Sequence, residues 1–338
     1  MPPEPSWWYQ KSPGFIATGL APIAGLYGWV LQARFSLAKP YRSRLPVLCA
    51  GNFTVGGSGK TPLTRHLCEC VRALGKRPVV LSRGYGGRLP GPHWVSTDDK
   101  ARETGDEPLL LARTGLVVIA RDRAAGAQAI EAAANADVIV MDDGLQNPQL
   151  HKDLAIVIVD GSRGLGNRRI VPAGPLRAPL ASQLPLAHAI VINDTVPGAG
   201  DEIGSWLKDQ YDGPVLRSAT IPSEDAGWLK ARRVVAWAGI AGPARFFGLL
   251  EQLGAVIVER FAFPDHVAPT PEQATQILHT AQAADAVLVS TEKDVVRLAG
   301  QFGPVAELEA ATKALPIRLA FSTRDGERLA SLVALAIK

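Results

Sequence analysis

An alternation of short apolar runs with longer helical segments constrains the fold more than any other feature of this sequence. From Leu45 onward the runs are bounded by Gly or Asp, and Ala/Leu-rich segments such as Leu63–Leu74 and Arg123–Ala134 lie between them. The runs are Val47–Ala50, Pro78–Leu81, Leu116–Ala120, Asp137–Met141, Leu154–Asp160 and Ala189–Asn193. Strands that alternate with helices are typical of βαβ units. The sequence therefore predicts an α/β fold with a largely parallel sheet.

A polar stretch, Pro222–Gly227, separates this pattern from a second, shorter series of the same kind. The second series comprises expected strands at Val234–Ala238, Ala255–Arg260 and Ala286–Ser290 and expected helices at Pro243–Leu253 and Pro271–Ala284. We therefore expect two α/β lobes with a cleft between them. The expected division is an N-terminal segment over residues 1–44, a core domain over 45–225 and a smaller C-terminal lobe over 226–338.

The N-terminal segment contains an uncharged stretch over residues 12–33 that is long enough to cross a bilayer. Five residues, four glycines and Pro22, interrupt it, and dense Leu, Ile and Val are missing. The flanks are aromatic before it and basic after it: Trp7, Trp8 and Tyr9, then Arg34, Lys39, Arg42 and Arg44. This pattern favours a membrane-associated interfacial helix. A helix packed on the protein's own core is the alternative.

Composition excludes several function classes. The 338 residues carry a formal net charge of only +4, and no Lys/Arg run is interleaved with aromatic residues, so no nucleic-acid partner is expected. Cys49, Cys68 and Cys70 form neither an even set nor a C-x-x-C pair, which argues against disulfide and zinc frameworks and favours a reducing compartment. No heptad run demands an oligomer, and we expect a monomer.

The sharpest local signal is the segment Gly51-Asn-Phe-Thr-Val-Gly-Gly-Ser-Gly-Lys-Thr-Pro62, between an expected strand and an expected helix. Backbone N–H groups of such a loop converge on phosphate oxygens at a helix N-terminus. In a P-loop, Lys60 reaches the β- and γ-phosphates and the Thr61 hydroxyl holds Mg²⁺. The nucleotide-binding candidates are Thr54, Val55, Gly56, Gly57, Ser58, Gly59, Lys60 and Thr61. Thr54 stands where the usual motif has glycine.

A second signal is the apolar strand at Val138, which ends in the paired acids Asp142 and Asp143. In P-loop proteins a carboxylate at this place meets the metal ion. Neighbouring side chains on a strand point to opposite faces, so at most one acid can face Mg²⁺ unless the chain bends. The sequence does not decide between them. Guanine-specific motifs are missing, since Met141 replaces the first acid of D-x-x-G, and we expect ATP.

Further candidates lie in loops. Asp106, in Gly-Asp-Glu-Pro, is either a first-turn helix acid or a general base, and His266, in Phe-Pro-Asp-His, is either a structural histidine or the partner of that base. Four more residues are candidate contacts to phosphates: Arg83, Tyr85, Arg123 and Arg177.

Taken together, these blocks resemble the tetraacyldisaccharide 4'-kinases, the lipid A 4'-kinases of Gram-negative bacteria. The shared blocks are Trp-Trp with Leu-Tyr-Gly-Trp, the glycine-rich loop with its unusual Thr54, Ser-Arg-Gly-Tyr-Gly-Gly, Gly-Asp-Glu-Pro, Asp-Asp-Gly-Leu-Gln, Pro-Ala-Gly-Pro-Leu-Arg, Phe-Pro-Asp-His and Thr-Glu-Lys-Asp. They occur in family order over nearly the whole chain. One position departs from the family, which commonly has an acid where this chain has Ala178.

The resemblance implies transfer of the γ-phosphate of MgATP to the 4'-hydroxyl of tetraacyldisaccharide 1-phosphate, which gives lipid IVA at the cytoplasmic face of the inner membrane. It implies a catalytic dyad of Asp106, the base, and His266. It also implies that Lys60 and Thr61 hold the phosphates and Mg²⁺, and that the paired acids Asp142 and Asp143 lie on the metal side. Arg83, Tyr85, Arg123 and Arg177 then line the nucleotide or substrate cleft.

Two other classes of enzyme compete with this interpretation. One is a P-loop ATPase that couples hydrolysis to conformational change or assembly, which would release phosphate without an acceptor. The other is a soluble small-metabolite kinase or ligase, in which the N-terminal helix would belong to the core. A non-enzymatic membrane scaffold would leave the glycine-rich loop and the paired acids unexplained.

Overall fold

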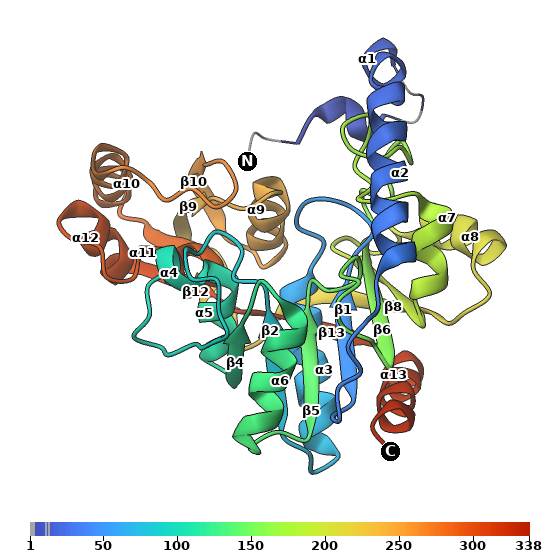
Figure 1. Cartoon of the computed structure of the whole chain (residues 1–338). Coiled ribbons are helices and arrows are strands. Elements are labelled where there is room, and N and C mark those ends of the chain that lie inside the picture. The colour runs from blue at the N-terminus through green and yellow to red at the C-terminus, as the bar shows by residue number, and fades with distance from the viewer. Residues whose placement is uncertain (1–3, 11, 13) are drawn as a thin grey trace.

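The computed structural model describes residues 4–10, 12 and 14–338, and its centre is a nine-stranded sheet (Figure 1). The strand order is β13-β8-β7-β6-β1-β5-β2-β4-β3, and all neighbours are parallel except at the two edges, where β13 and β3 are antiparallel. Its strands are β1 Val47–Gly51, β2 Pro78–Ser82, β3 His93–Trp94, β4 Leu116–Ile119, β5 Val138–Asp142, β6 Leu154–Asp160, β7 Ala189–Asp194, β8 Val215–Pro222 and β13 Ile317–Phe321. The predicted α/β fold with a large parallel sheet is confirmed.

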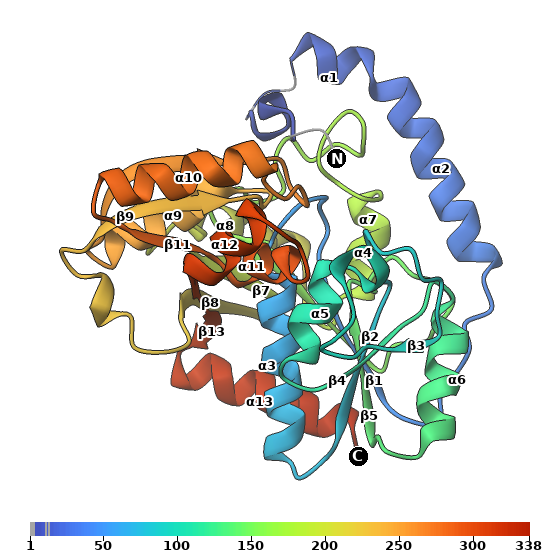
Figure 2. The same cartoon turned by 90° about the vertical axis from the view of Figure 1, so that its left-hand side faces the viewer.

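A second sheet of four parallel strands lies beside the first, in the order β10-β9-β11-β12. Its strands are β9 Arg233–Ala238, β10 Val256–Ala262, β11 Val287–Thr291 and β12 Thr312–Leu315. Helix α9 contributes Phe246, Phe247 and Leu250 to the core on one face, and α10 contributes Ala274 and Ile277 to the core on the other. This sheet and its helices form the smaller lobe of Figure 2.

Helices cover both sheets. They are η1 Ser6–Tyr9, α1 Phe15–Gly19, α2 Ala21–Leu37, α3 Lys60–Ala73, α4 Ala101–Thr104, α5 Asp106–Ala112, α6 Arg123–Ala133, α7 Leu180–Gln183, η2 Leu184–Leu186, α8 Asp201–Gln210, η3 Gly227–Leu229, α9 Pro243–Gln252, α10 Pro271–Ala283, α11 Glu292–Leu298, α12 Pro304–Ala311 and α13 Thr323–Ala336.

The large sheet is buried on both faces, which explains why its strands are continuous apolar runs rather than alternating ones. On one face the amphipathic helix α3 packs Leu63, Leu67 and Val71 against β1 and β5, and on the other α6 packs Ala127 and Ile130. Because the central strands are parallel, their carboxyl ends meet at one edge of the sheet. Loops at that edge form the binding crevice of open α/β sheets.

The end of the chain differs from the expected lobe over residues 226–338. Strand β13 pairs antiparallel with β8, and α13 packs Leu329 and Val333 into the core of the large sheet. Residues 317–336 therefore belong to the nine-stranded sheet and its cover. The reason is that β8 would otherwise leave an unpaired edge and an uncovered apolar face.

Helices α1 and α2 project from the body, as both views of the ribbon show (Figures 1 and 2). Only Ala24 and Gly28 of α2 are buried, and a Cβ on Gly28 would lie 2.9 Å from Cδ1 of Ile170. Trp29 and Leu37 are 67% and 83% exposed. The helix thus contacts the body mainly through small residues and leaves most of its large apolar side chains outside, with Leu31 and Phe35 half-buried, so its assignment to the core is wrong.

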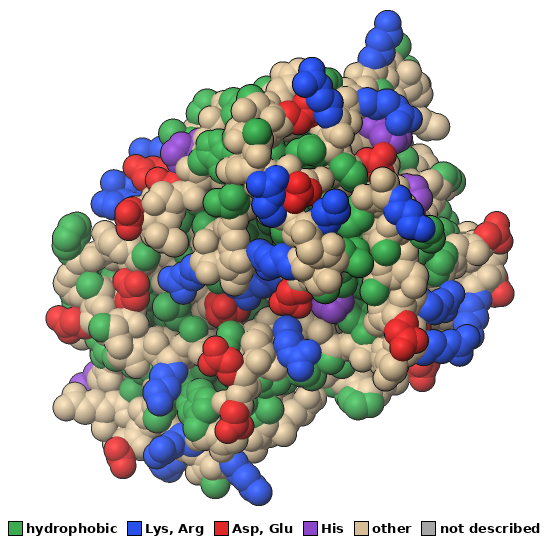
Figure 3. All heavy atoms as spheres, turned by 90° about the horizontal axis from the view of Figure 1, so that it is seen from below, with side chains coloured by type: hydrophobic (Ala, Val, Ile, Leu, Met, Phe, Trp, Pro, Cys, Tyr) green, Lys and Arg blue, Asp and Glu red, His purple; other side chains and the backbone are tan. Residues whose placement is uncertain are grey.

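The exposed apolar side chains of α2 contrast with the opposite end of the molecule. On that face acidic and basic side chains are interspersed (Figure 3). No helix built from described residues combines the length and the apolarity needed to cross a membrane. Lys11 and Pro13 of the N-terminal segment lie outside the described residues.

Candidate nucleotide and phosphotransfer site

The glycine-rich loop follows β1 at the carboxyl edge of the large sheet and leads directly into α3. Gly59 is the N-cap of α3 with φ +96°, and Gly56 has φ +93°, conformations that side chains other than glycine rarely adopt. A Cβ on Gly56 would also overlap the carboxylate of Glu4, which lies against the loop. The loop therefore presents its backbone at a helix N-terminus, the arrangement that binds phosphate.

The start of the loop is held by the segment around Arg177. The Val55 N–H donates to the Pro175 carbonyl at 2.8 Å and the Arg177 N–H to the Phe53 carbonyl at 2.9 Å. Thr54 itself forms an isolated antiparallel bridge with Leu176. Extended backbone suits a β-branched residue, which explains why threonine replaces the usual glycine at this position.

Lys60, Asp143 and Arg177 form a charged cluster beside the loop. Arg177 binds Asp143 through two N–H···O bonds of 2.8 and 3.0 Å and donates from Nε to the Thr54 carbonyl at 2.9 Å. The Lys60 Nζ lies 3.9 Å from Oδ2 of Asp143. Burial alone would raise the pKa of Asp143, but Arg177 and Lys60 outweigh it and hold this pKa at about 2. Asp143 is therefore a carboxylate that already has its counterions.

Asp142 differs from its neighbour because it is buried without a cation. Its carboxylate accepts hydrogen bonds from Thr64 Oγ1 at 2.8 Å and Ser82 Oγ at 3.4 Å, and no ion pair to it exists within the described part of the chain. Burial, Glu107 and Asp143 raise its pKa to about 7. The chain bends directly after β5, since Asp143 has φ +51°. The two acids thus occupy different environments, since Asp143 is paired with cations and Asp142 is not. The sequence alone did not distinguish them.

The paired acids fit a magnesium ion only together with other ligands. Among the described residues no group of three or more His, Cys, Asp or Glu side chains could hold a metal ion by itself. Mg²⁺ commonly takes one or two carboxylates together with substrate phosphates and waters. The buried, unpaired Asp142 carboxylate near the loop is a donor of that kind.

Asp106 and His266, which are 160 residues apart in sequence, meet across the two lobes with Oδ2 and Nδ1 3.0 Å apart. Asp106 begins α5, and its Oδ1 accepts from the Glu107 N–H at 2.9 Å. The His266 ring lies 5.3 Å from the Tyr85 ring, centroid to centroid. Burial raises the pKa of Asp106, but Lys293, the hydrogen bond with His266, and Arg297 hold it well below its usual range. Asp106 is thus an ionised carboxylate with a histidine partner.

The remaining candidates lie in unlike environments. Arg83 is exposed, and Tyr85 is 41% exposed. Arg123 is only 2% exposed and donates from Nη1 to the Ala120 carbonyl, while its Nε has no partner. Burial lowers the pKa of Arg123 to about 10, although Asp142 and Asp143 oppose the shift. Ala178 is buried and offers no ligand.

Sequence reasoning missed Arg245, which comes from the smaller lobe and contacts the glycine-rich loop. Its Nη2 donates to the Gly57 carbonyl at 2.6 Å, and its Nη1 pairs with Asp160 at the end of β6. Arg245 and Gly57 are 188 residues apart, and no spacing in the sequence could relate them. Arg297 of α11, which pairs with Asp106 across the lobes, was missed for the same reason.

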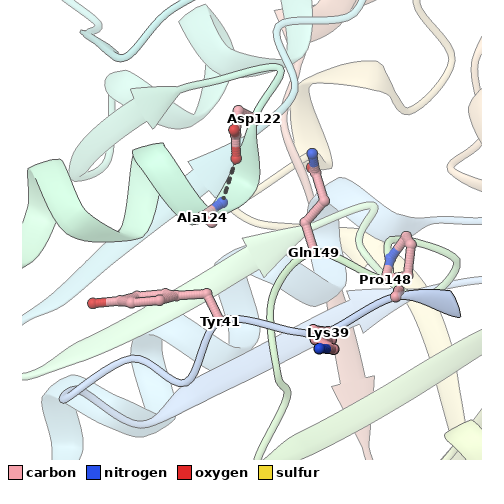
Figure 4. Close-up of a pocket in the computed structure, with 7 residues that line it drawn as sticks. Lys39, Tyr41, Asp122, Ala124, Pro148 and Gln149 are labelled. Carbon is pink, nitrogen blue, oxygen red and sulfur yellow. Dashed lines mark hydrogen bonds between the residues drawn. The ribbon is translucent and has the colours of Figure 1, made fainter.

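A hollow next to the C-terminal end of α2 is lined by none of the predicted site residues, although two of its residues flank Arg123 (Figure 4). It is lined by Lys39, Tyr41, Asp122 and Gln149, together with Ala38, Ala124 and Pro148. The side chains predicted from the motifs gather at the sheet edge instead.

A strand, a glycine-rich loop and a helix, with an acid at the end of the neighbouring strand, define the class: this is a P-loop nucleotide-binding protein. Comparison with known families gives the particular one. The model of the family described as tetraacyldisaccharide-1-P 4'-kinase matches residues 16–335, and the chain belongs to that family.

Curated relatives agree with the family model. The chain is 45% identical over 334 residues to a tetraacyldisaccharide 4'-kinase of Methylorubrum extorquens, covering 97% of this chain and 98% of the relative. It is 43% identical to the enzyme of the same name from Nitrobacter winogradskyi, covering 96% and 95%. The resemblance drawn from the motifs is confirmed, and the chain is a kinase.

A solved structure extends the agreement to the fold. The LpxK protein of Aquifex aeolicus, crystallised in complex with ATP, superimposes with a TM-score of 0.72 at 25% identity. The match covers 96% of this chain and 100% of that one. The two chains thus share nearly their whole length, which includes both lobes.

Proposed function

We propose that this chain transfers the γ-phosphate of ATP to the 4'-hydroxyl of tetraacyldisaccharide 1-phosphate, in lipid A biosynthesis. The observation that carries the proposal is the pairing of Asp106 with His266 at 3.0 Å in a member of this kinase family. A nucleotide hydrolase needs only a positioned water, whereas a kinase needs a base for the acceptor hydroxyl. A carboxylate held by a histidine from the other lobe meets that need.

The nucleotide would lie on the glycine-rich loop, with its β- and γ-phosphates at the loop N–H groups and at Lys60. Thr61 and Asp142 would hold Mg²⁺, which supplies charge neutralisation on the transferring phosphoryl group. Arg177 and Asp143 keep the loop and Lys60 in place through their contacts with Thr54 and with each other. Arg83, Tyr85 and Arg123 line the same cleft in this proposal.

The chemical step assigns Asp106 the role of base. Its carboxylate takes the proton of the 4'-hydroxyl while the bond from that oxygen to the γ-phosphorus forms. The bond between the γ-phosphorus and the bridging oxygen breaks, and ADP leaves with the electron pair. His266 orients the carboxylate through Nδ1 and is a positioning residue in this step.

The acyl chains of the substrate account for α1 and α2. A substrate that stays in the bilayer requires an enzyme that docks on its surface. Phe15 is fully exposed, and Leu26 and Trp29 on α2 are 64% and 67% exposed, an apolar set without an internal partner. We propose that this helical arm lies at the cytoplasmic face of the inner membrane and that the enzyme acts as a monomer.

The test is transfer of labelled γ-phosphate from ATP, with Mg²⁺ and detergent, to tetraacyldisaccharide 1-phosphate. We expect a bisphosphorylated lipid from the wild type, loss of product by at least about 100-fold in Lys60→Ala, and full activity in Lys208→Ala, a control at an exposed lysine of α8. Lys60-dependent release of free phosphate without a lipid product would support the coupled ATPase and refute the proposal.

A further inference from the structure

The Thr-Glu-Lys-Asp segment has no role in the proposed reaction, although it begins α11 beside the site. Helix α11 docks on the P-loop lobe at α5, where Val296 packs against Leu109 and Leu110. Three of its side chains make ion pairs across the lobes: Glu292 with Arg65 at 2.8 Å, Lys293 with Glu107 at 3.1 Å, and Arg297 with Asp106 at 2.6 Å. One helix of the smaller lobe thus holds the segment that carries the proposed base.

Arg297 contacts Asp106 directly and the backbone on either side of His266. Its Nη2 and Nε donate to Oδ2 of Asp106 at 2.6 and 3.2 Å, the same oxygen that lies 3.0 Å from His266. Its Nη1 donates to the carbonyls of Gly239 at 3.1 Å and Val267 at 3.5 Å. The Gly239 carbonyl also accepts the His266 N–H at 3.2 Å. One guanidinium therefore binds both the Asp106 carboxylate and the backbone carbonyls next to His266.

Arg297 is itself held in place by the buried carboxylate of Asp294. Its Nη1 donates to Oδ1 of Asp294 at 2.7 Å, and Asp294 is fully buried. The Asp294 carboxylate is held in turn by the Gly239 N–H at 3.0 Å and by the Thr291 hydroxyl at 2.7 Å. A Cβ on Gly239 would lie only 2.8 Å from the Val267 carbonyl oxygen. The chain can therefore approach Val267 this closely at position 239 because glycine has no side chain. Such fixation restricts the rotamers of Arg297 to the one that reaches Asp106.

We propose that Arg297 is a positioning residue of the phosphotransfer reaction, which fixes the Asp106 carboxylate and the backbone of His266 across the two lobes. This inference rests on the proposed role of Asp106 as base. A guanidinium suits the task because its planar fork reaches one carboxylate and two carbonyls at once, which an ammonium group cannot do. The charge of Arg297 also keeps Asp106 ionised.

The charged and titratable groups that face Asp106 come from every element packed on it. They are His266 and Asp265 from the loop after β10, Lys293, Asp294 and Arg297 from α11, Glu107 from α5 itself, and Tyr85 beside His266. Burial opposes ionisation of Asp106, and removal of Arg297 would leave Lys293, His266 and the Glu107 N–H to favour it. The pKa of Asp106 should then rise, and the base would be protonated at a higher pH than in the wild type.

The experiment compares Arg297→Met, Arg297→Lys and Asp106→Asn with the wild type in the lipid phosphorylation assay, with kcat and KM measured separately. For Arg297→Met we expect kcat about 10- to 100-fold lower with KM for ATP within about twofold, because the base is displaced while the nucleotide site is intact. Arg297→Lys keeps the positive charge beside Asp106 and should recover part of kcat.

Several outcomes overturn the proposal. Wild-type kcat in Arg297→Met would do so. Equal losses of kcat in Arg297→Met and Arg297→Lys, or a KM for ATP that rises together with the loss of kcat, would also do so, because they indicate a purely structural role. Thermal unfolding of each variant shows whether it folds, and Arg297→Lys keeps the test decisive if the methionine variant does not.

The controls separate this inference from the proposed function. No lipid product from the wild type refutes the proposed function itself. If the wild type transfers phosphate but Asp106→Asn does so nearly as well, the assignment of the base is wrong, and the role of Arg297 falls with it. An inactive Asp106→Asn beside an unaffected Arg297→Met refutes the role of Arg297 alone.

Discussion

The buried carboxylate of Asp142 leads to the prediction that one substitution will raise the stability of the protein and remove its activity. Asp142 is 1% exposed, and without a bound cation its negative charge has only hydroxyl donors, from Thr64 and Ser82. Asn has nearly the same shape and no charge. We therefore expect Asp142→Asn to stabilise the nucleotide-free protein at neutral and alkaline pH while abolishing its activity.

The magnitude follows from the pKa of Asp142, which burial, Glu107 and Asp143 raise from 3.8 to about 7. Between these values the folded protein holds a proton that the unfolded chain releases, so stability falls as pH rises through this window. Above it the difference amounts to about 4 kcal/mol. A weakened hydrogen bond in the Asn variant offsets about 1 kcal/mol. The net gain of about 3 kcal/mol corresponds to roughly 4 °C in Tm for 338 residues.

The assay is thermal unfolding in EDTA without nucleotide at pH 8 and pH 5. We expect Asp142→Asn to melt roughly 4 °C above the wild type at pH 8 and within about 1 °C of it at pH 5. Asp143→Asn is the matched control and should melt lower than the wild type, because it breaks the pair with Arg177. A variant of Asp142 that melts at or below the wild type at pH 8 would refute the reasoning.

Two other predictions concern surfaces. Trp29→Glu on the exposed face of α2 should lower binding to anionic phospholipid vesicles about tenfold in a sedimentation assay, and equal binding of this variant and of the control Leu335→Glu on α13 would contradict membrane docking by α2. Arg245→Met removes the partner of Asp160 and the donor to the Gly57 carbonyl, and should destabilise the protein by about 3 kcal/mol in urea unfolding. It should also raise KM for ATP, and an unchanged KM would show that Gly57 needs no support from the smaller lobe.

The central strands of the large sheet could be read from the sequence because each is a local apolar run buried on both faces. The expected strand at Val47–Ala50 differs by one residue from β1, and the expected Leu154–Asp160 is β6 as observed. The glycine-rich loop and the acid after β5 were likewise local signals, since strand, loop and helix follow one another along the chain. Helix α11 and the edge strands β3, β12 and β13 were not found in this way, whereas the expected Ala255–Arg260 overlaps the edge strand β10.

The last strand, β13, shows what local sequence patterns cannot predict. Ile317–Phe321 is apolar apart from Arg318, and nothing in its composition says which sheet it joins. Pairing with β8 rather than with the neighbouring β12 depends on an open edge of the large sheet and on an apolar face that α13 covers. Such choices are made by distant segments, and local patterns do not record them.

The sequence by itself determined the α/β fold, the phosphate-binding loop and the family, because these depend on short-range order and on motifs that chemistry restricts. The tertiary structure decided how the charges are paired. In the folded protein Asp143 pairs with Arg177, Asp142 has no cation partner, and Arg297 pairs with Asp106, which is 191 residues away in the sequence. The physical reason is that a charge buried in a protein depends on whichever groups folding places within a few ångströms, and those partners come from elements that only the packing of the two lobes brings together.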